Sequence, residues 1–169
     1  CSPVAIFHTQ NYFNSWADLM ARSIHMVGVR RDDVFQNMSG YGLFTGGLGI
    51  HFGAERLCCM TIPAGAGNSR RQIKLAKDFR TTVAHILPSY ALILVEHLRN
   101  MGEDPRQFPL RIALVGAEPY TEEFRRRIED LFDMKAYNSY GLSEMNGPGV
   151  GFECLHQAGM HLWEDAYIP

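Results

Sequence analysis

The sequence YNSYGLSE, at residues 137–144, concentrates the groups that a magnesium–nucleotide site needs. The ring of Tyr140 offers a flat face on which a base can stack, and Gly141 lets the backbone turn sharply or approach a ligand closely. Ser143 can donate a hydrogen bond to a phosphate oxygen, and Glu144 is a hard oxygen ligand of the kind that Mg²⁺ prefers. Short motifs also recur by chance, so a plain surface turn between two strands is the alternative.

Around this motif, apolar strands alternate with helices along the chain. Short apolar runs predict strands at residues 4–7, 32–37, 58–63, 82–87, 111–115 and 134–138, and a final hairpin from residues 150–154 and 161–164. Apolar side chains at helical spacing predict a helix between Thr9 and Gly28 and further helices at residues 54–57, 70–79, 89–101 and 121–132. This alternation predicts an α/β fold with a mostly parallel sheet.

Two further stretches extend the candidate site. In open α/β sheets, ligands bind beyond the carboxyl ends of strands, and the turn at residues 116–119 follows one strand as YNSYGLSE follows the next. Two adjacent strand ends could cradle one adenine, or the turn could be a tight strand-to-helix connection with Pro119 leading into the helix. Residues 39–49 place Tyr41 and Phe44 among glycines and hydroxyls, which suits a flat aryl acid or a core bend.

The longer context of these motifs resembles a known family. YNSYGLSE resembles the nucleotide-binding motif N-x-Y-G-x-[TS]-E of adenylate-forming enzymes, and SEMNGPGVGFEC, with HLWED soon after, resembles phenylacetate–CoA ligases and their relatives. SGYGLFTGGLGIHFGAERL at residues 39–57 and LVGAEPYTEEFRRRIE at residues 114–129 agree in order and spacing. The resemblance covers essentially the whole chain. It implies an aryl-acid–CoA ligase that uses ATP, Mg²⁺ and coenzyme A and forms an acyl-adenylate before the thioester.

The resemblance also implies roles for individual residues. The expected catalytic pair is Ser143, at the α-phosphate, and Glu144, which would hold Mg²⁺. The expected ATP-binding residues are Gly116, Ala117, Glu118, Pro119, Asn138, Ser139, Tyr140, Gly141 and Ser143. The expected acyl-pocket residues are Tyr41, Phe44, Gly46, Gly116 and Ala117. Many relatives carry an aromatic residue where this chain has Ser39, and this departure leaves the identity of the aryl acid open.

Other functions fit parts of the same sequence. A coenzyme F390 synthetase-like enzyme would adenylate its substrate without making a thioester, and the motifs here serve only the nucleotide half-reaction. A dinucleotide-binding oxidoreductase module would rest on Gly65 and Gly67, after a strand and before a helix. Arg70 stands where the third glycine of that fingerprint belongs, and no acidic residue closes a strand about 20 residues further on.

Zinc is a further candidate ligand of this chain. Cys154 and His161 flank the expected hairpin turn, and related ligases share them as far as the resemblance goes. A structural zinc site requires four ligands, so this pair accounts for only half of one. The alternative is a buried cysteine beside a polar histidine.

The amino-acid composition limits which other classes of protein and partner are possible. Hydrophobic residues make up 46% of the 169 residues and charged residues 20%, which supports about one folded domain. The net charge of −2 without a basic stripe argues against nucleic acid as a partner, and no apolar run is long enough for a membrane span. Four cysteines without framework spacing favour reduced thiols in the cytoplasm. A homodimer stays open.

The sequence also leads to an expectation about domain organisation. Adenylate-forming enzymes of the family that the chain resembles are several times longer. Residues 1–169 are therefore expected to be an internal part of the large N-terminal adenylating domain. The phosphate loop is expected upstream, and the lid domain with the catalytic lysine downstream. This piece alone is expected to be inactive.

Overall fold

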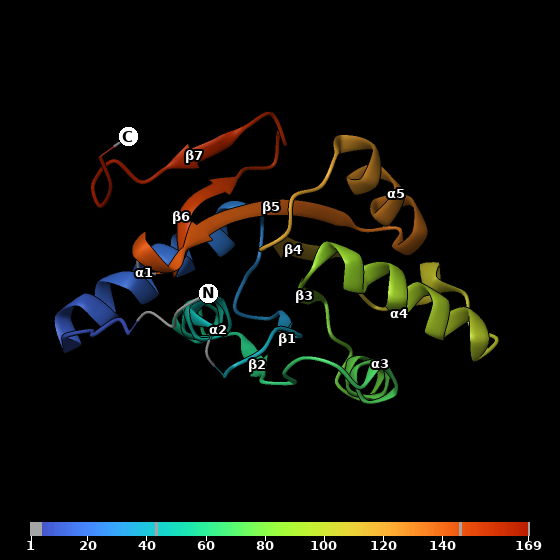
Figure 1. Cartoon of the computed structure of the whole chain (residues 1–169). Helices are drawn as coiled ribbons and strands as arrows, with labels where there is room; N and C mark the ends of the chain where they lie inside the picture. Colours follow the sequence, from blue (N-terminus) through green and yellow to red (C-terminus); the bar gives the residue numbers. More distant parts are fainter. Residues whose placement is uncertain (1–4, 43, 146, 169) are drawn as a thin grey trace.

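The computed structural model describes residues 5–42, 44–145 and 147–168, in which helices and strands alternate (Figure 1). The helices are α1 (Gln10–Met26), α2 (Thr45–Arg56), α3 (Ser69–Asp78), α4 (Pro88–Asn100) and α5 (Glu122–Phe132), with short 3-10 helices η1 (Pro105–Gln107) and η2 (Ser143–Met145). The strands are β1 (Val34–Asn37), β2 (Met60–Ile62), β3 (Val83–Ile86), β4 (Ile112–Gly116), β5 (Lys135–Leu142), β6 (Gly147–Glu153) and β7 (Met160–Leu162).

The described strands form one seven-stranded sheet in the order β2-β1-β3-β4-β5-β6-β7. The pairs from β2 to β5 are parallel, whereas β6 and β7 add to β5 in antiparallel fashion. The predicted α/β fold with a mostly parallel sheet and a final hairpin is therefore confirmed. The strand order reverses between β1 and β3, and ligand sites of open α/β sheets lie beyond the carboxyl ends of the strands at such a reversal.

Helices cover both faces of the sheet, which gives three layers (Figure 1). Strand residues alternate between the faces. Ala84 and Ile86 of β3 pack in the apolar cluster that includes α3, α4 and α5, whereas Val83 packs in the cluster that includes α1 and α2. The same alternation in β4 separates Val115 from Leu114. Both faces of the central strands are buried, as their continuous apolar runs predict.

Local sequence signals account for where several helices begin. The hydroxyl of Thr9 accepts a hydrogen bond from the backbone N–H of Tyr12 (3.2 Å) and caps α1, and Thr121 caps α5 in the same way. Pro88 occupies the first turn of α4, where a missing N–H costs nothing. Gly28 follows α1 with φ 91, a left-handed conformation that glycine adopts without strain.

The predicted first strand and the predicted start of the second helix differ from the structure. Residues 5–9 form no strand, and Phe7 is 93% exposed; Val4 lies outside the described residues. Helix α2 begins at Thr45, inside the glycine-rich run that was expected to precede it. A Cβ on Gly49 would lie 2.3 Å from the Trp16 ring, and one on Gly53 would lie 2.5 Å from Met20 Cβ. Close packing against α1 therefore compensates for the poor helix propensity of glycine.

One buried carboxylate ties β1 to β3 and β4. Asp33 is 7% exposed. It accepts hydrogen bonds from the Arg30 backbone N–H (2.7 Å), the Thr82 hydroxyl (2.7 Å) and the guanidinium of Arg111. Burial alone raises the pKa of Asp33, but the hydrogen bonds from these three partners outweigh it and hold the pKa below its ordinary value.

Substitution of this carboxylate should therefore have a pH-dependent effect on stability. Asp33→Asn should lower the free energy of unfolding by about 2 kcal/mol at pH 7, because hydrogen bonds to charged groups are lost. The folded-state pKa lies below the unfolded one, so this stabilisation is complete above about pH 4 and disappears as the pH falls through the folded-state pKa. Urea denaturation at a series of pH values from 7 to 2 measures the free energy of unfolding of the wild type and the variant. The control is Asp32→Asn, whose side chain is 96% exposed; equal losses in both variants would contradict the prediction.

Candidate active site

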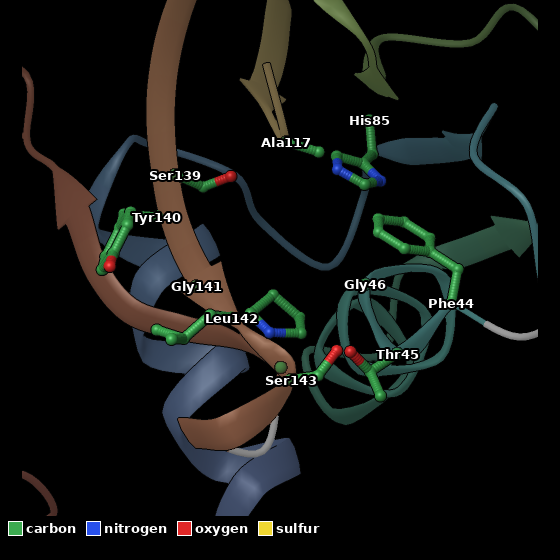
Figure 2. A pocket seen from close by; sticks show the side chains of 12 residues that line it. Phe44, Thr45, Gly46, His85, Ala117, Ser139, Tyr140, Gly141, Leu142 and Ser143 are labelled. Carbon is green, nitrogen blue, oxygen red and sulfur yellow. The ribbon is translucent and has the colours of Figure 1, made fainter. Parts of the chain in front are cut away.

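A pocket of about 450 Å³, which includes space open to solvent, lies at the carboxyl ends of the parallel strands (Figure 2). It is formed by the start of α2, the ends of β3, β4 and β5, and the start of β6. The residues that line it are Phe44, Thr45, Gly46, His85, Ala117, Ser139, Tyr140, Gly141, Leu142, Ser143, Gly147 and Pro148. The pocket thus occupies the place where the strand order of the sheet favours a ligand site.

This pocket brings together residues that the sequence assigned to two different ligands. Three of them, Phe44, Gly46 and Ala117, belong to the predicted acyl set. Four more, Ser139, Tyr140, Gly141 and Ser143, belong to the predicted nucleotide set. Ala117 belongs to both sets. Segments from the beginning and the end of the chain converge here. Such convergence is the geometry that a reaction between an acid and a nucleotide requires.

The YNSYGLSE motif lies mostly within a strand. The sequence placed it in a turn after a strand that ends at Asn138, but β5 continues to Leu142 because β6 pairs with it beyond the end of β4. The prediction of the strand end is therefore wrong. Ser139 is buried, whereas Tyr140 is 50% exposed and stands on the opposite side of β5 from Phe44 and His85 (Figure 2). Tyr140 is consequently not a core tyrosine.

The ladder between β5 and β6 has a register shift at Tyr140 and Gly141. Tyr140 pairs with Gly151, but Gly141 pairs with Pro148, so two residues of β6 lie between these partners. A Cβ on Gly141 would lie 2.3 Å from the Gly147 carbonyl oxygen. Gly141 is thus required by the close approach of β6, which is a different use from the sharp turn or the close approach to a ligand that the sequence led us to expect.

Two glycines make room for their neighbours in the same region. A Cβ on Gly46 would lie 2.4 Å from Cζ of Phe44, whose ring covers this position (Figure 2). A Cβ on Gly116 would lie 2.5 Å from the Ser139 carbonyl oxygen, its partner residue in the parallel pair of β4 and β5. Gly116 does not line the pocket, but it allows β5 to pass close to β4 at the site.

Other predicted site residues lie beside the pocket and take different partners. Glu118 accepts hydrogen bonds from the backbone N–H (3.0 Å) and the hydroxyl (2.9 Å) of Ser89 at the start of α4. The Tyr41 hydroxyl lies 3.0 Å from Nδ1 of His51. None of Glu118, Pro119, Asn138, Tyr41 and Glu144 is among the described residues that line the pocket.

Glu144 and Asn138 are the two residues outside the pocket lining that the resemblance assigned to polar contacts with Mg²⁺ and adenine. Glu144 is exposed in η2, directly after Ser143, which lines the pocket. The backbone N–H of Asn138 donates to the buried carboxylate of Glu153 (2.7 Å). Glu144 therefore remains accessible at the edge of the site, whereas the backbone of Asn138 is part of the sheet structure.

His85 is a pocket residue that the sequence analysis missed. It lies at the end of β3 and is 5% exposed. Its Nδ1 lies 3.0 Å from Oδ1 of Asn37 and 3.1 Å from the hydroxyl oxygen of Ser39. Burial lowers the pKa of His85 to about 4, so the imidazole is neutral at physiological pH. The available signal was a lone histidine in an apolar strand, close to its carboxyl end.

Ser39, where many relatives carry an aromatic residue, lies beneath the pocket. It is fully buried, and its hydroxyl donates to Oδ1 of Asn37 (2.7 Å). Asn37 in turn donates from Nδ2 to the carbonyl of Gly47 (2.7 Å). A small hydroxyl residue at this position therefore completes a polar network under His85.

The structure gives little support to the two alternative ligand sites, one for zinc and one for a dinucleotide. In the described part of the chain, no group of three or more His, Cys, Asp or Glu side chains could hold a metal ion, so Cys154 and His161 gather no third zinc ligand. The loop with Gly65 and Gly67 is occupied by Gln72, whose amide donates to the carbonyls of both glycines (2.5 and 3.2 Å).

Among the described helices, none has the length and apolarity to cross a membrane.

Comparison with known proteins identifies the family. Residues 3–166 match the model of the family described as AMP-binding enzyme. The chain is 45% identical to a phenylacetate-coenzyme A ligase of Pseudomonas putida and 42% identical to one of Thermus thermophilus, in each case over 99% of the chain and 38% of the relative. The chain thus spans about 38% of the length of these curated relatives.

Solved structures agree with this assignment. A 2-hydroxyisobutyryl-CoA ligase in complex with 2-HIB-AMP and CoA superimposes with a TM-score of 0.91 at 27% identity, over 98% of this chain and 36% of that one. A benzoate CoA ligase from Burkholderia xenovorans LB400 shares the fold with a TM-score of 0.74 at 18% identity, over 92% of this chain and 32% of that one. The chain therefore belongs to the AMP-binding enzyme family, as its resemblance to adenylate-forming enzymes predicted.

Proposed function

We propose that this chain carries the acid- and adenylate-binding part of an ATP-dependent aryl-acid–CoA ligase. The observation that supports the proposal most directly is the shared pocket, where Phe44 and Gly46 from the acyl set meet Ser139 and Ser143 from the nucleotide set. The similarity to phenylacetate-coenzyme A ligases supports the same chemistry. Acid, ATP and coenzyme A are the proposed substrates, and the cytoplasm is the proposed location.

The proposed reaction has two steps. A carboxylate oxygen of the acid attacks the α-phosphorus of ATP, and pyrophosphate leaves, which gives an acyl-adenylate. The sulfur of coenzyme A then attacks the acyl carbon, and AMP leaves with the electrons of the broken C–O bond while the thiol loses its proton. A free carboxylate acylates poorly, and AMP supplies the missing leaving group. The protein contributes positioning and electrostatic stabilisation at the α-phosphate.

The proposal gives four residues of the site a task. Tyr140 stacks on adenine, and Ser143 donates a hydrogen bond to an α-phosphate oxygen. Phe44 forms the apolar wall for the aryl group. Glu144, exposed directly after Ser143, suits Mg²⁺, which takes one or two protein carboxylates and completes its shell with phosphate oxygens and water. Bound there, Mg²⁺ would neutralise phosphate charge. Zinc is left out of the proposal, because the described residues supply no third ligand.

We further infer that residues 1–169 form an internal part of the large N-terminal adenylating domain. The share of the relatives that the chain spans, about 38%, supports this organisation. The phosphate loop would precede these residues, and a lid domain with a catalytic lysine would follow them. The homodimer and the absence of nucleic-acid and membrane partners stay predictions.

ATP–pyrophosphate exchange in the intact enzyme tests the proposed function. Exchange that depends on an aryl acid, followed by release of AMP and a thioester on addition of coenzyme A, is the expected result. Exchange without thioester formation would favour the coenzyme F390 synthetase-like alternative. No exchange with any carboxylic acid would contradict adenylation altogether.

The half-exposed ring of Tyr140 provides a test of the nucleotide position. Tyr140→Ala should weaken ATP binding by about 1–3 kcal/mol, which is the range for a base stacked on an aromatic ring. Tyr140→Phe should cost little, because stacking uses the face of the ring and not the hydroxyl. Thermal stability should change little in either variant, since half of the side chain is already in solvent. Calorimetric titration with ATP measures the affinities, and normal affinity in folded Tyr140→Ala would remove Tyr140 from the adenine site.

A further inference from the structure

His85 connects the pocket to a buried polar network beneath it. Its ring is almost fully enclosed, yet it lines the pocket together with Phe44 and Ala117. Within the described part of the chain, the hydrogen bonds of the ring all involve Nδ1, on the side of Asn37 and Ser39. Figure 2 shows the other ring nitrogen turned toward Ala117 and Ser139. Nε2 therefore faces the pocket, and within the described residues it has no hydrogen-bond partner.

The network determines which nitrogen of His85 carries the proton. Asn37 donates from Nδ2 to the Gly47 carbonyl, so its amide orientation is fixed and Oδ1 faces the histidine. An amide oxygen can only accept hydrogen bonds. The hydroxyl hydrogen of Ser39 is already directed at the same oxygen. Nδ1 must consequently carry a hydrogen and donate it to Asn37, which leaves Nε2 as a bare acceptor.

The charge state of the ring agrees with this assignment. Burial keeps the imidazole neutral at physiological pH, so Nε2 does not gain a second proton there. An acceptor directed into a ligand pocket without a protein partner favours a ligand with an O–H or N–H group at that point. It disfavours an apolar group that would displace water and leave the nitrogen unpaired.

The position of His85 indicates which part of the ligand it meets. His85 lies beside Phe44 and Gly46, the wall proposed for the acyl group, whereas Tyr140 stands on the far side of β5 (Figure 2). The adenine and the acyl group would thus occupy different ends of the pocket. A donor that reaches Nε2 of His85 belongs to the acyl end.

From this geometry we propose that the acid substrate is an aryl acid with a hydroxyl or amino substituent, and that this substituent donates a hydrogen bond to Nε2 of His85. The inference rests on the proposed function and narrows its substrate class. Ser39 and Asn37 act as positioning residues, since they hold the imidazole in the tautomer that accepts. A larger aromatic residue in place of Ser39 would remove the hydroxyl from this network.

The test compares matched acids in the intact enzyme. Phenylacetate and benzoate are paired with their hydroxy, amino and methoxy derivatives, and kcat/KM is measured by acid-dependent pyrophosphate exchange. The unmodified enzyme should prefer at least one hydroxy- or amino-substituted acid over its parent by about tenfold or more, because the parent displaces water from Nε2 and leaves this acceptor unpaired. The methoxy derivative of that acid should lose the advantage, since it can accept a hydrogen bond but not donate one.

Variants of His85 separate hydrogen bonding from shape. His85→Leu should reduce the ratio of kcat/KM between the donor-substituted acid and its parent to about one, and His85→Gln should keep part of the preference, because its side-chain oxygen still accepts. The matched control is His97→Leu, a half-buried histidine of α4 outside the pocket, which should preserve the preference. Melting temperatures establish that each variant is folded.

The outcomes distinguish this inference from the proposed function. Exchange with aryl acids but without preference for a donor substituent in the unmodified enzyme overturns the role of His85 and leaves the ligase proposal intact. A preference that survives in His85→Leu overturns it as well. The absence of exchange with every acid overturns both proposals together. Since the first comparison needs no variant, the inference remains testable even if His85→Leu does not fold.

Discussion

Glu144→Gln in the intact enzyme should lower acid-dependent pyrophosphate exchange at least about a hundredfold while the protein stays folded. Loss of one group that stabilises transition-state charge typically costs a factor of about 10²–10³. The amide is nearly isosteric with the carboxylate but neutral, so it binds Mg²⁺ poorly. Within the described ranges, the Glu144 side chain takes part in no ion pair or hydrogen bond, and it is exposed in η2. The fold therefore gains little from its charge.

The metal dependence of the variant provides the second measurement. If Glu144 holds Mg²⁺, the Mg²⁺ concentration for half-maximal exchange should rise in Glu144→Gln, whereas the KM for the acid should change little. Glu123→Gln is a matched control, because Glu123 is an exposed carboxylate in the first turn of α5 and lies outside the pocket. Exchange at the wild-type level in Glu144→Gln would remove this residue from the metal site.

Gly141→Ala should lower the free energy of unfolding by about 3 kcal/mol, at the upper end of the usual cost of overpacking. The new Cβ would lie 2.3 Å from the Gly147 carbonyl oxygen and 2.6 Å from Pro148 Cα. Both are backbone atoms, so no side-chain rotation can relieve the contact. Strand β6 would have to move away from β5, and the pairs of the ladder near the pocket would weaken. Urea denaturation and pyrophosphate exchange should both record the change.

A second glycine serves as the control for this substitution. Gly40→Ala adds the same methyl group where no atom lies within 4 Å and the backbone has no positive φ. Its free energy of unfolding should stay within about 0.5 kcal/mol of the wild type, as is usual for substitutions away from close contacts. Equal stability of Gly141→Ala and Gly40→Ala would show that β6 does not approach β5 as closely as the structure indicates.

The sequence was sufficient for most elements of this fold because their signals are local. The hydroxyls of Thr9 and Thr121 cap α1 and α5, and Pro88 begins α4, so these helices could be placed from neighbouring residues alone. The start of α2 could not, because glycines at positions 49 and 53 become favourable only through contact with α1. The full length of β5 likewise depends on its pairing with β6.

The candidate site was predictable to the extent that it lies at strand ends. Ala117 and Ser143 follow from glycine-bearing turns near the carboxyl ends of β4 and β5, and they do line the pocket. The sequence did not identify His85 as a site residue, because a single histidine in an apolar strand does not indicate which residues it contacts. Those partners are Asn37, the last residue of β1, and Ser39, which follows this strand, and both precede His85 by more than 40 residues. Hydrogen bonds between distant segments leave no periodic trace in a sequence.

The register shift between β5 and β6 bears on how the chain can vary in length. Two residues of β6, Gly149 and Val150, lie between the partners of Tyr140 and Gly141, and they bulge away from the ladder. On its other edge, β5 keeps its regular parallel pairing with β4 up to Gly116 and Ser139. Insertion or deletion of a residue within this bulge would therefore change its size without shifting the pairing of β5 with β4. The β5 residues that line the pocket would keep their alignment with β4, whereas the same change in β5 itself would turn the β5 residues on one side of it to the opposite face.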